Sequence, residues 1–136
     1  MLSPLLRSIV YASEGLWHAI ATERNLKIFS AGVVFSLVCA LFFRIQTIDW
    51  ILVLLSGGVF LSAELINTSL ERLSSAFYRH VEDAKDTHKH RGAMKETKDV
   101  AAAASLVLAI VWAATMLIIF WPYFFEFLVR AGFRIG

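Results

Sequence analysis

Four polar residues recur on one face of a predicted helix. Glu64, Asn67, Thr68 and Glu71 stand at positions i, i+3, i+4 and i+7, directly after an apolar stretch, so a helix would place their side chains together. Each strongly polar group costs on the order of 2 to 3 kcal/mol to carry into hydrocarbon, which predicts a functional site at the membrane boundary. The two carboxylates would lie about 10.5 Å apart along the helix axis, too far to share one proton. This separation suits a reaction between a reactant dissolved in the membrane and another in water, with Glu64 as the general base.

Residues elsewhere in the chain could complete this site. Glu71 is a candidate metal ligand, but Mg²⁺ prefers octahedral oxygen coordination that carboxylates share with water and phosphates. Glu23, just before the first apolar segment, is the best second ligand. Lys98 and Asp99, where the last apolar segment begins, add a phosphate-binding ammonium and a further acceptor. No glycine-rich phosphate loop precedes a helix, so side chains and metal would have to hold a phosphorylated ligand.

The composition indicates that membrane helices position these residues. Of the 136 residues, 58% are hydrophobic and 18% are charged, and the mean hydropathy is +0.66, a more apolar profile than that of soluble domains. Three apolar segments, 26–43, 50–73 and 100–127, predict three helical spans, of which the second is completed by the polar-faced turns. The net charge of +2 is too small and too dispersed to indicate a nucleic-acid partner.

The remaining segments complete a single integral membrane domain over 1–136. Apolar residues at intervals of three or four predict an amphipathic surface helix over 5–22, and a short turn near Arg44 predicts that the first two spans form a hairpin. The segment 76–98 has many charges and three histidines, which predicts a solvated cytoplasmic loop that could be partly helical, with Gly92 as its expected break. Basic residues concentrate before the first span and in this loop, so the N-terminus and the loop are expected in the cytoplasm and the C-terminus outside.

The order and spacing of these motifs relative to the spans resemble the prokaryotic diacylglycerol kinase family, which includes the undecaprenol kinases. The resemblance extends from about Arg7 to about Phe120 and depends on three sets of segments. These are Glu14-Gly15-Leu16 with Thr22-Glu23-Arg24-Asn25, then Ala63-Glu64-Leu65-Ile66-Asn67-Thr68 with Glu71-Arg72, and then Lys98-Asp99-Val100-Ala101-Ala102.

The resemblance implies an all-α membrane protein of the bacterial cytoplasmic (inner) membrane. It would form a homotrimeric bundle with one surface helix and three spans per protomer, and its active sites would lie between protomers. The implied activity is transfer of the terminal phosphate of ATP to a lipid alcohol, converting diacylglycerol to phosphatidic acid, with undecaprenol as the alternative acceptor. Mg²⁺ or Mn²⁺ would accompany ATP. Membrane lipid, ATP and other copies of the chain are therefore the expected partners.

The resemblance also implies a role for each site residue. Glu64 would activate the lipid hydroxyl, while Glu23 and Glu71 would bind the divalent ions. The nucleotide contacts would be Arg7, Tyr11, Glu23, Asn67, Glu71, Tyr78, His80, Lys98 and Asp99. The lipid contacts would be Trp17, His18, Ala19, Ile20 and Glu64.

Two features depart from the family pattern, and two other functions stay open. Ser74 and Ser75 stand where the family generally has a Val-Asp pair, and the segment between Glu71 and Lys98 is several residues longer than usual. A small proton-coupled transporter could instead use Glu64 as an intramembrane substrate site. A noncatalytic adaptor that recruits a partner through its charged loop would need none of the acids.

Purely structural roles are the alternatives at each position. The face from 64 to 71 could be a hydrated helix end. Glu23 could form an ion pair with Arg24 or Lys27, and Lys98 and Asp99 could be an ordinary charge pair next to the membrane. Burial and hydrogen-bond partners distinguish these roles from a built site.

Overall fold

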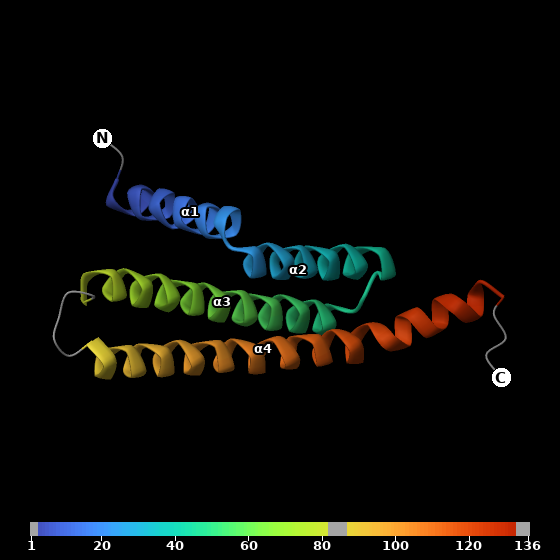
Figure 1. The fold of residues 1–136 in the computed structure, drawn as a ribbon. Helices are drawn as coiled ribbons and strands as arrows, with labels where there is room; N and C mark the ends of the chain where they lie inside the picture. Colours follow the sequence, from blue (N-terminus) through green and yellow to red (C-terminus); the bar gives the residue numbers. More distant parts are fainter. Residues whose placement is uncertain (1–2, 82–86, 133–136) are drawn as a thin grey trace.

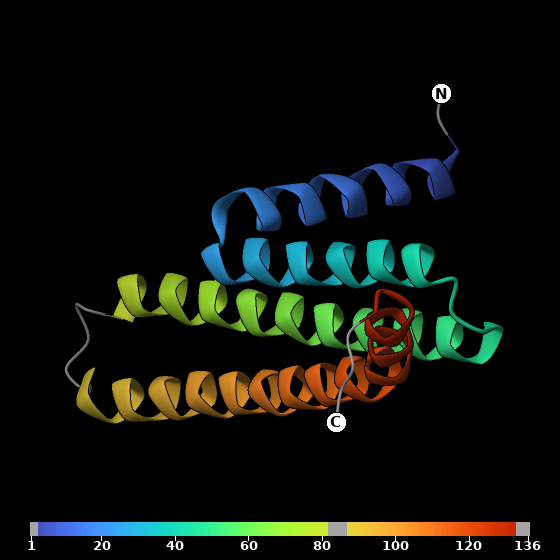
Figure 2. The same cartoon turned by 90° about the vertical axis from the view of Figure 1, so that its right-hand side faces the viewer.

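The chain folds into four α-helices that follow one another across the molecule. The computed structural model describes residues 3–81 and 87–132, with side chains for all of these except 79–81 and 87–90. The helices are α1 (Pro4–Thr22), α2 (Arg24–Phe43), α3 (Thr47–Val81) and α4 (Thr87–Arg130), and the described residues contain no strand. Both views place α3 between α2 and α4, with α1 beyond α2 at one end (Figures 1 and 2). The all-α class is confirmed.

A single extended residue separates α1 from α2. Ser3 caps the start of α1, where its side chain accepts a hydrogen bond from the backbone N–H of Leu6 at 3.3 Å, and Pro4 occupies the first turn, as is common at helix starts. At the other end Glu23 has φ −97° and ψ 123° and belongs to neither helix. The break therefore places one of the predicted site residues in the corner between two helices.

The turn between α2 and α3 forms the predicted hairpin. Arg44 adopts the left-handed conformation (φ 51°, ψ 52°), and its N–H and that of Ile45 bond back to the carbonyls of Leu41 and Ala40, which closes the helix end. The Tyr123 hydroxyl then joins α4 to this turn. It accepts from the backbone N–H of Gln46 at 3.1 Å and donates to the Asp49 carboxylate at 2.6 Å.

The helices pack through small residues and aromatic rings. Trp112 of α4 stacks on Phe60 of α3 with ring centroids 5.2 Å apart. Its indole lies against Gly32 of α2 and near Gly57 of α3, where an added Cβ would come within 3.0 and 3.7 Å of the ring, respectively. Glycine at these positions therefore allows α2, α3 and α4 to approach one another closely.

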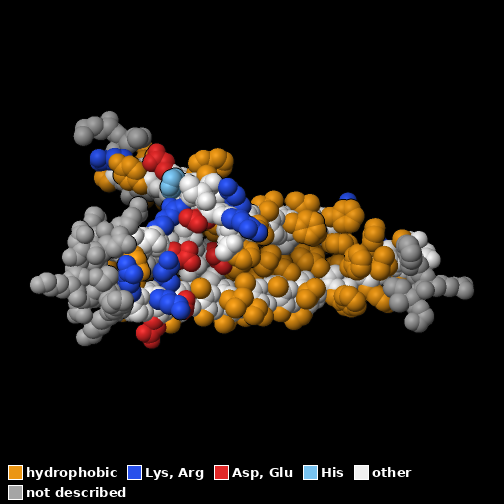
Figure 3. Space-filling view, in the orientation of Figure 1, with side chains coloured by type: hydrophobic (Ala, Val, Ile, Leu, Met, Phe, Trp, Pro, Cys, Tyr) orange, Lys and Arg blue, Asp and Glu red, His pale blue; other side chains and the backbone are white. Residues whose placement is uncertain are grey.

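Three of the helices are long and apolar enough to cross a membrane. The segments 24–43, 47–78 and 91–130 have mean hydropathies of 2.2, 1.7 and 2.5, respectively, and most of their large hydrophobic side chains lie on the surface. Figure 3 shows hydrophobic side chains along most of the molecule and charged ones gathered at the end that holds α1, the C-terminal part of α3 and the N-terminal part of α4. The prediction of three apolar spans is confirmed, whereas the amphipathic placement of α1 and the membrane orientation stay predictions.

Over 76–81 and 87–98 the chain is helical, whereas the sequence predicts a loop that is helical only in part. Helix α3 continues to Val81 and α4 already begins at Thr87, so Gly92 lies inside a helix instead of breaking one. The stretch Ala93-Met94-Lys95-Glu96 contains strong helix formers. Its charges indicate a solvent-exposed helix as readily as a loop.

Candidate active site

The predicted general base is buried between two helices. Glu64 on α3 is 6% exposed and Ser105 on α4 is 3% exposed, and the Ser105 hydroxyl donates a hydrogen bond to Glu64 Oε1. Thr68, one turn along α3, is 7% exposed. A merely hydrated helix end is therefore excluded for the inner part of this face.

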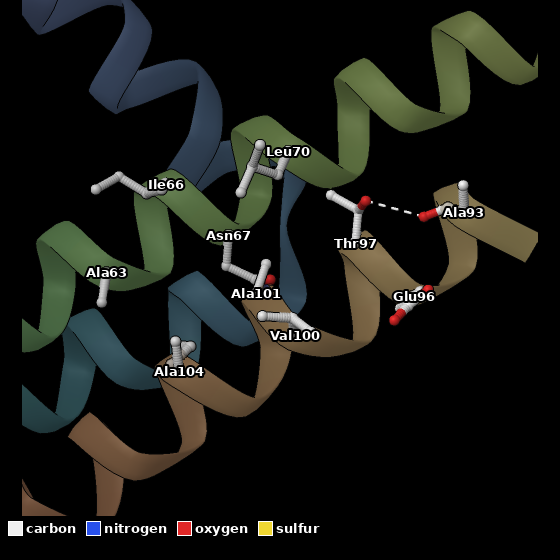
Figure 4. Close-up of a pocket in the computed structure, with 11 residues that line it drawn as sticks. Ala63, Ile66, Asn67, Leu70, Ala93, Glu96, Thr97, Val100, Ala101 and Ala104 are labelled. Atoms are coloured by element: carbon white, nitrogen blue, oxygen red, sulfur yellow. Dashed lines mark hydrogen bonds between the residues drawn. The ribbon is translucent and has the colours of Figure 1, made fainter.

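The next residues of the same face are only partly covered. Asn67 and Glu71 are half-buried, and the amide oxygen Oδ1 of Asn67 is buried without a hydrogen-bond partner among the described residues. Figure 4 shows Asn67 directed from α3 toward Ala101 of α4. An unpartnered buried acceptor of this kind is costly, so it marks a position where a ligand donor could bind.

A groove of about 640 Å³ runs beside this pair of helices. Asn67 and Ser105 contribute polar atoms to it, whereas most of its other walls are alanine and branched aliphatic side chains (Figure 4). The complete lining is Ala63, Ile66, Asn67, Leu70, Ala93, Glu96, Thr97, Val100, Ala101, Ala104 and Ser105. Its chemistry suits a ligand with a long apolar chain and a small polar head.

Glu23 is held by an arginine that the sequence analysis did not assign to the site. Arg72 donates to Glu23 Oε1 through Nη2 at 2.9 Å and through Nε at 3.2 Å, and its Nη2 also bonds the Thr22 hydroxyl at 2.6 Å. The Arg72 and Glu23 side chains are 40% and 35% exposed, respectively. Glu23 therefore does not form the alternative ion pair with Arg24 or Lys27. Arg72 instead ties the α1–α2 corner to α3.

The two predicted metal ligands have carboxylate oxygens that remain available. Of the four carboxylate oxygens of Glu23 and Glu71, only Glu23 Oε1 accepts a hydrogen bond from a described residue. No group of three or more His, Cys, Asp or Glu side chains gathers within the described residues. Carboxylate oxygens are suitable ligands for Mg²⁺ or Mn²⁺, but two such residues could hold the ion only with phosphate and water in its other positions, and they do not form an all-protein metal cage.

A second groove, of about 790 Å³, lies between the end of α3 and the start of α4. It brings together three of the predicted nucleotide contacts, Tyr78, Lys98 and Asp99, and it shares no lining residue with the first groove. Its other lining residues are Ser74, Ser75, Arg91, Gly92, Met94 and Lys95. The structure therefore places these three residues at one cavity, and their role as nucleotide contacts stays a prediction.

Arg91 and Lys95 are cations of this groove that the sequence analysis missed. With Lys98 they stand at i, i+4 and i+7 on α4, so they share one helical face. The Arg91 guanidinium lies 4.8 Å from the ring centroid of Tyr78, within the range of a cation–π contact. The spacing of these three basic residues is present in the sequence, but it predicts a shared face only if the segment is a helix.

The predicted contacts on α1 line neither groove. Arg7, Tyr11, Trp17 and His18 are exposed, with Tyr11 at 67% and Trp17 at 74%. Of the other two predicted lipid contacts, Ala19 is buried and Ile20 is half-buried. The side chain of His80 falls outside the described residues. In this structure Asn67, Tyr78, Lys98 and Asp99 line the two grooves of α3 and α4, whereas the exposed α1 residues line neither.

Comparison with known proteins supplies the family. The model of the prokaryotic diacylglycerol kinase family matches residues 10–120. A curated undecaprenol kinase from Bacillus subtilis (strain 168) is 35% identical over 122 residues, which cover 89% of this chain and 91% of that protein. No solved structure matches the chain. The match spans α1 to α4 and includes every acid discussed above, so this chain belongs to the prokaryotic diacylglycerol kinase family, a family of membrane lipid kinases.

Proposed function

We propose that this protein transfers the terminal phosphoryl group of ATP to the hydroxyl of a membrane lipid alcohol. The observation that supports this most directly is the burial of Glu64 between α3 and α4, where the Ser105 hydroxyl donates a hydrogen bond to its carboxylate. Ser105, the hydrogen-bond partner of Glu64, lines the groove with aliphatic walls, so the carboxylate lies directly behind one wall of that groove. The two separate grooves fit two reactants of different polarity.

In the proposed reaction Glu64 accepts the proton of the lipid hydroxyl as its oxygen attacks the terminal phosphorus in line. The new O–P bond forms as the bond to the ADP oxygen breaks. Bound Mg²⁺ or Mn²⁺ would neutralise phosphate charge, and Glu23 and Glu71 are the residues that would hold it. Catalysis of this type comes mainly from positioning and charge neutralisation.

The nucleotide would occupy the groove between the end of α3 and the start of α4. Lys98 and Lys95 can neutralise phosphate oxygens, and Asp99 supplies an acceptor beside them. The ring of Tyr78 offers a flat surface for a base, next to the guanidinium of Arg91. This arrangement replaces a glycine-rich phosphate loop with side chains.

Undecaprenol is the first acceptor to test. The sequence analysis favoured diacylglycerol, the acceptor in the family's name, but the 35% identical relative is an undecaprenol kinase. The groove beside Asn67 and Ser105 has mostly aliphatic walls and suits acyl and prenyl chains alike. Both alcohols therefore remain candidates for the same mechanism, with undecaprenol preferred because of this relative.

We also propose a homotrimer in the bacterial inner membrane, with the N-terminus and the charged end in the cytoplasm. The exposed apolar faces of the three long helices leave room for contacts with other copies as well as with lipid. The exposed α1 contacts, including Tyr11 and Trp17, would then complete the site of a neighbouring protomer. Cross-linking in native membranes would test this oligomer.

The decisive experiment follows ³²P from ATP into extracted lipid. Purified protein in mixed micelles should label undecaprenol, diacylglycerol or both, and Glu64→Gln should retain ATP binding but lose transfer by at least about a hundredfold, in keeping with the loss of a general base. Full turnover by Glu64→Gln would remove Glu64 from that role. Proton flux in liposomes without ATP consumption would instead support a transporter.

A further inference from the structure

The hydroxyl of Ser105 differs from most other described helical hydroxyls in its choice of partner. Ser36, Ser56, Ser69 and Thr115 all donate to a backbone carbonyl in their own helix, at 2.7 to 2.8 Å, the ordinary behaviour of serine and threonine within helices. Ser105 instead donates across the interface to the Glu64 carboxylate, 41 residues away in the chain. Its hydroxyl is therefore directed to one specific side-chain atom.

The sequence around Ser105 shows that packing does not explain this residue. Four consecutive alanines, 101–104, precede it on α4 and supply the small side chains that let membrane helices approach closely. A fifth alanine would serve the same purpose. Serine adds only a hydroxyl there, and both that residue and its partner Glu64 are more than nine-tenths buried.

The hydrogen bond leaves the two oxygens of Glu64 unequal. Oε1 accepts from Ser105, whereas Oε2 has no hydrogen-bond partner among the described residues. A hydrogen bond has preferred distances and angles at both the donor and the acceptor. It can therefore hold the carboxylate in one orientation and leave Oε2 as the oxygen that accepts a proton.

We propose that Ser105 is a positioning residue that fixes the Glu64 carboxylate for proton transfer from the lipid alcohol. The inference rests on the proposed kinase function and on Glu64 as its base. Ser105 touches neither substrate in this mechanism; it acts through Glu64. A serine that only satisfied a buried carboxylate would affect folding and would leave the turnover of folded enzyme unchanged.

The test compares three substitutions at position 105 in purified, full-length protein. Ser105→Ala removes the hydroxyl, and Ser105→Cys keeps nearly the same volume with a much weaker donor. Both should lower kcat by about tenfold while KM for ATP stays within about twofold. Ser105→Thr keeps the hydroxyl and should restore kcat to within about threefold of the unchanged protein.

Two controls separate positioning from folding. Ser36→Ala removes a hydroxyl from a residue that is 4% exposed and bonds only its own helix, so it should leave kcat unchanged. Circular dichroism on heating measures the folded fraction of every variant, and kcat is expressed per folded protein. In a Glu64→Gln background, Ser105→Ala should cause no further loss, because the base it positions is already absent.

The outcomes distinguish this inference from the function on which it rests. Full turnover by Ser105→Ala, or a Ser105→Cys variant as active as the unchanged protein, would overturn the role of Ser105 and leave the kinase in place. A Ser105→Thr variant that folds but is as slow as Ser105→Ala would also overturn it. Absence of phosphate transfer by the unchanged protein would overturn the proposed function together with this inference.

Discussion

Replacing Arg72 with lysine tests whether the geometry of the α1–α2 corner contributes to the site. Arg72 reaches Glu23 Oε1 with two nitrogens, at 2.9 and 3.2 Å, and the Thr22 hydroxyl at 2.6 Å. Lysine keeps the positive charge but has no planar fork, so it can keep at most part of this arrangement. The substitution therefore changes geometry while the local net charge stays constant.

The magnitude follows from the exposure of the pair. The side chains are 40% and 35% exposed, so the ion pair itself contributes only about 0.2 to 1 kcal/mol, and the hydroxyl contact adds about 1 kcal/mol. We expect Arg72→Lys to lose about 1 kcal/mol in total. If Glu23 is a metal ligand, this corresponds to a roughly fivefold higher half-saturating Mg²⁺ concentration.

Kinase turnover is measured against Mg²⁺ at saturating ATP, and unfolding is followed by circular dichroism in the same detergent. Arg130→Lys is the matched control, because Arg130 pairs with Glu126 at 2.6 Å but the two side chains are 77% and 60% exposed. That variant should change neither measurement. An unchanged Mg²⁺ requirement and an unchanged unfolding curve for Arg72→Lys would refute the assignment of the corner to the metal site.

Two further predictions concern helix packing. Gly57→Ala places a Cβ 3.3 Å from Val33, whereas the Cβ of Gly58→Ala meets no atom within 4 Å. Both variants gain the same helix propensity, so their difference in stability comes from packing alone. Gly57→Ala should therefore be less stable than Gly58→Ala by about 1 to 3 kcal/mol. Detergent unfolding measures this difference, and the opposite order would indicate that the Gly58 face packs against another copy. Tyr123→Phe removes the hydroxyl that donates to Asp49 and should lower the free energy of unfolding by about 1 to 2 kcal/mol. The half-saturating ATP concentration should stay unchanged, because this contact lies at the opposite end of the molecule from the charged groove. A changed half-saturating ATP concentration at unchanged stability would show that the Tyr123 contact does affect the charged groove.

The parts of the fold that could be predicted are those that depend on local periodicity. Apolar runs gave the three long helices, and the i, i+3, i+4, i+7 spacing correctly placed Glu64 and Thr68 on a buried face. Boundaries were less certain, because charges at 76–98 describe the polarity of a segment and not its backbone conformation. Helix α4 therefore begins earlier than its hydropathy indicates.

The partners of the acids could not be predicted, because they come from distant parts of the chain. Nothing in the local pattern pairs Arg72 with Glu23, 49 residues away, or Ser105 with Glu64, 41 residues away. Such pairs depend on the depth at which each helix ends and on which face it turns to its neighbour. The same limit applies to the α1 residues, whose contacts depend on neighbouring copies if the proposed trimer forms.

Glu23 and Glu64 have different hydrogen-bond partners because their surroundings differ. Glu23 and Glu64 each accept hydrogen bonds through Oε1 from one other helix, and among the described residues Oε2 has no partner in either case. The Arg72 guanidinium holds Glu23 with two nitrogens at a partly exposed corner, where water screens the charges of both side chains. A cation beside the buried Glu64 would have to be taken out of water, which carries a large desolvation cost. A neutral hydroxyl orients the carboxylate without adding charge, so Arg72 suits Glu23 and Ser105 suits Glu64.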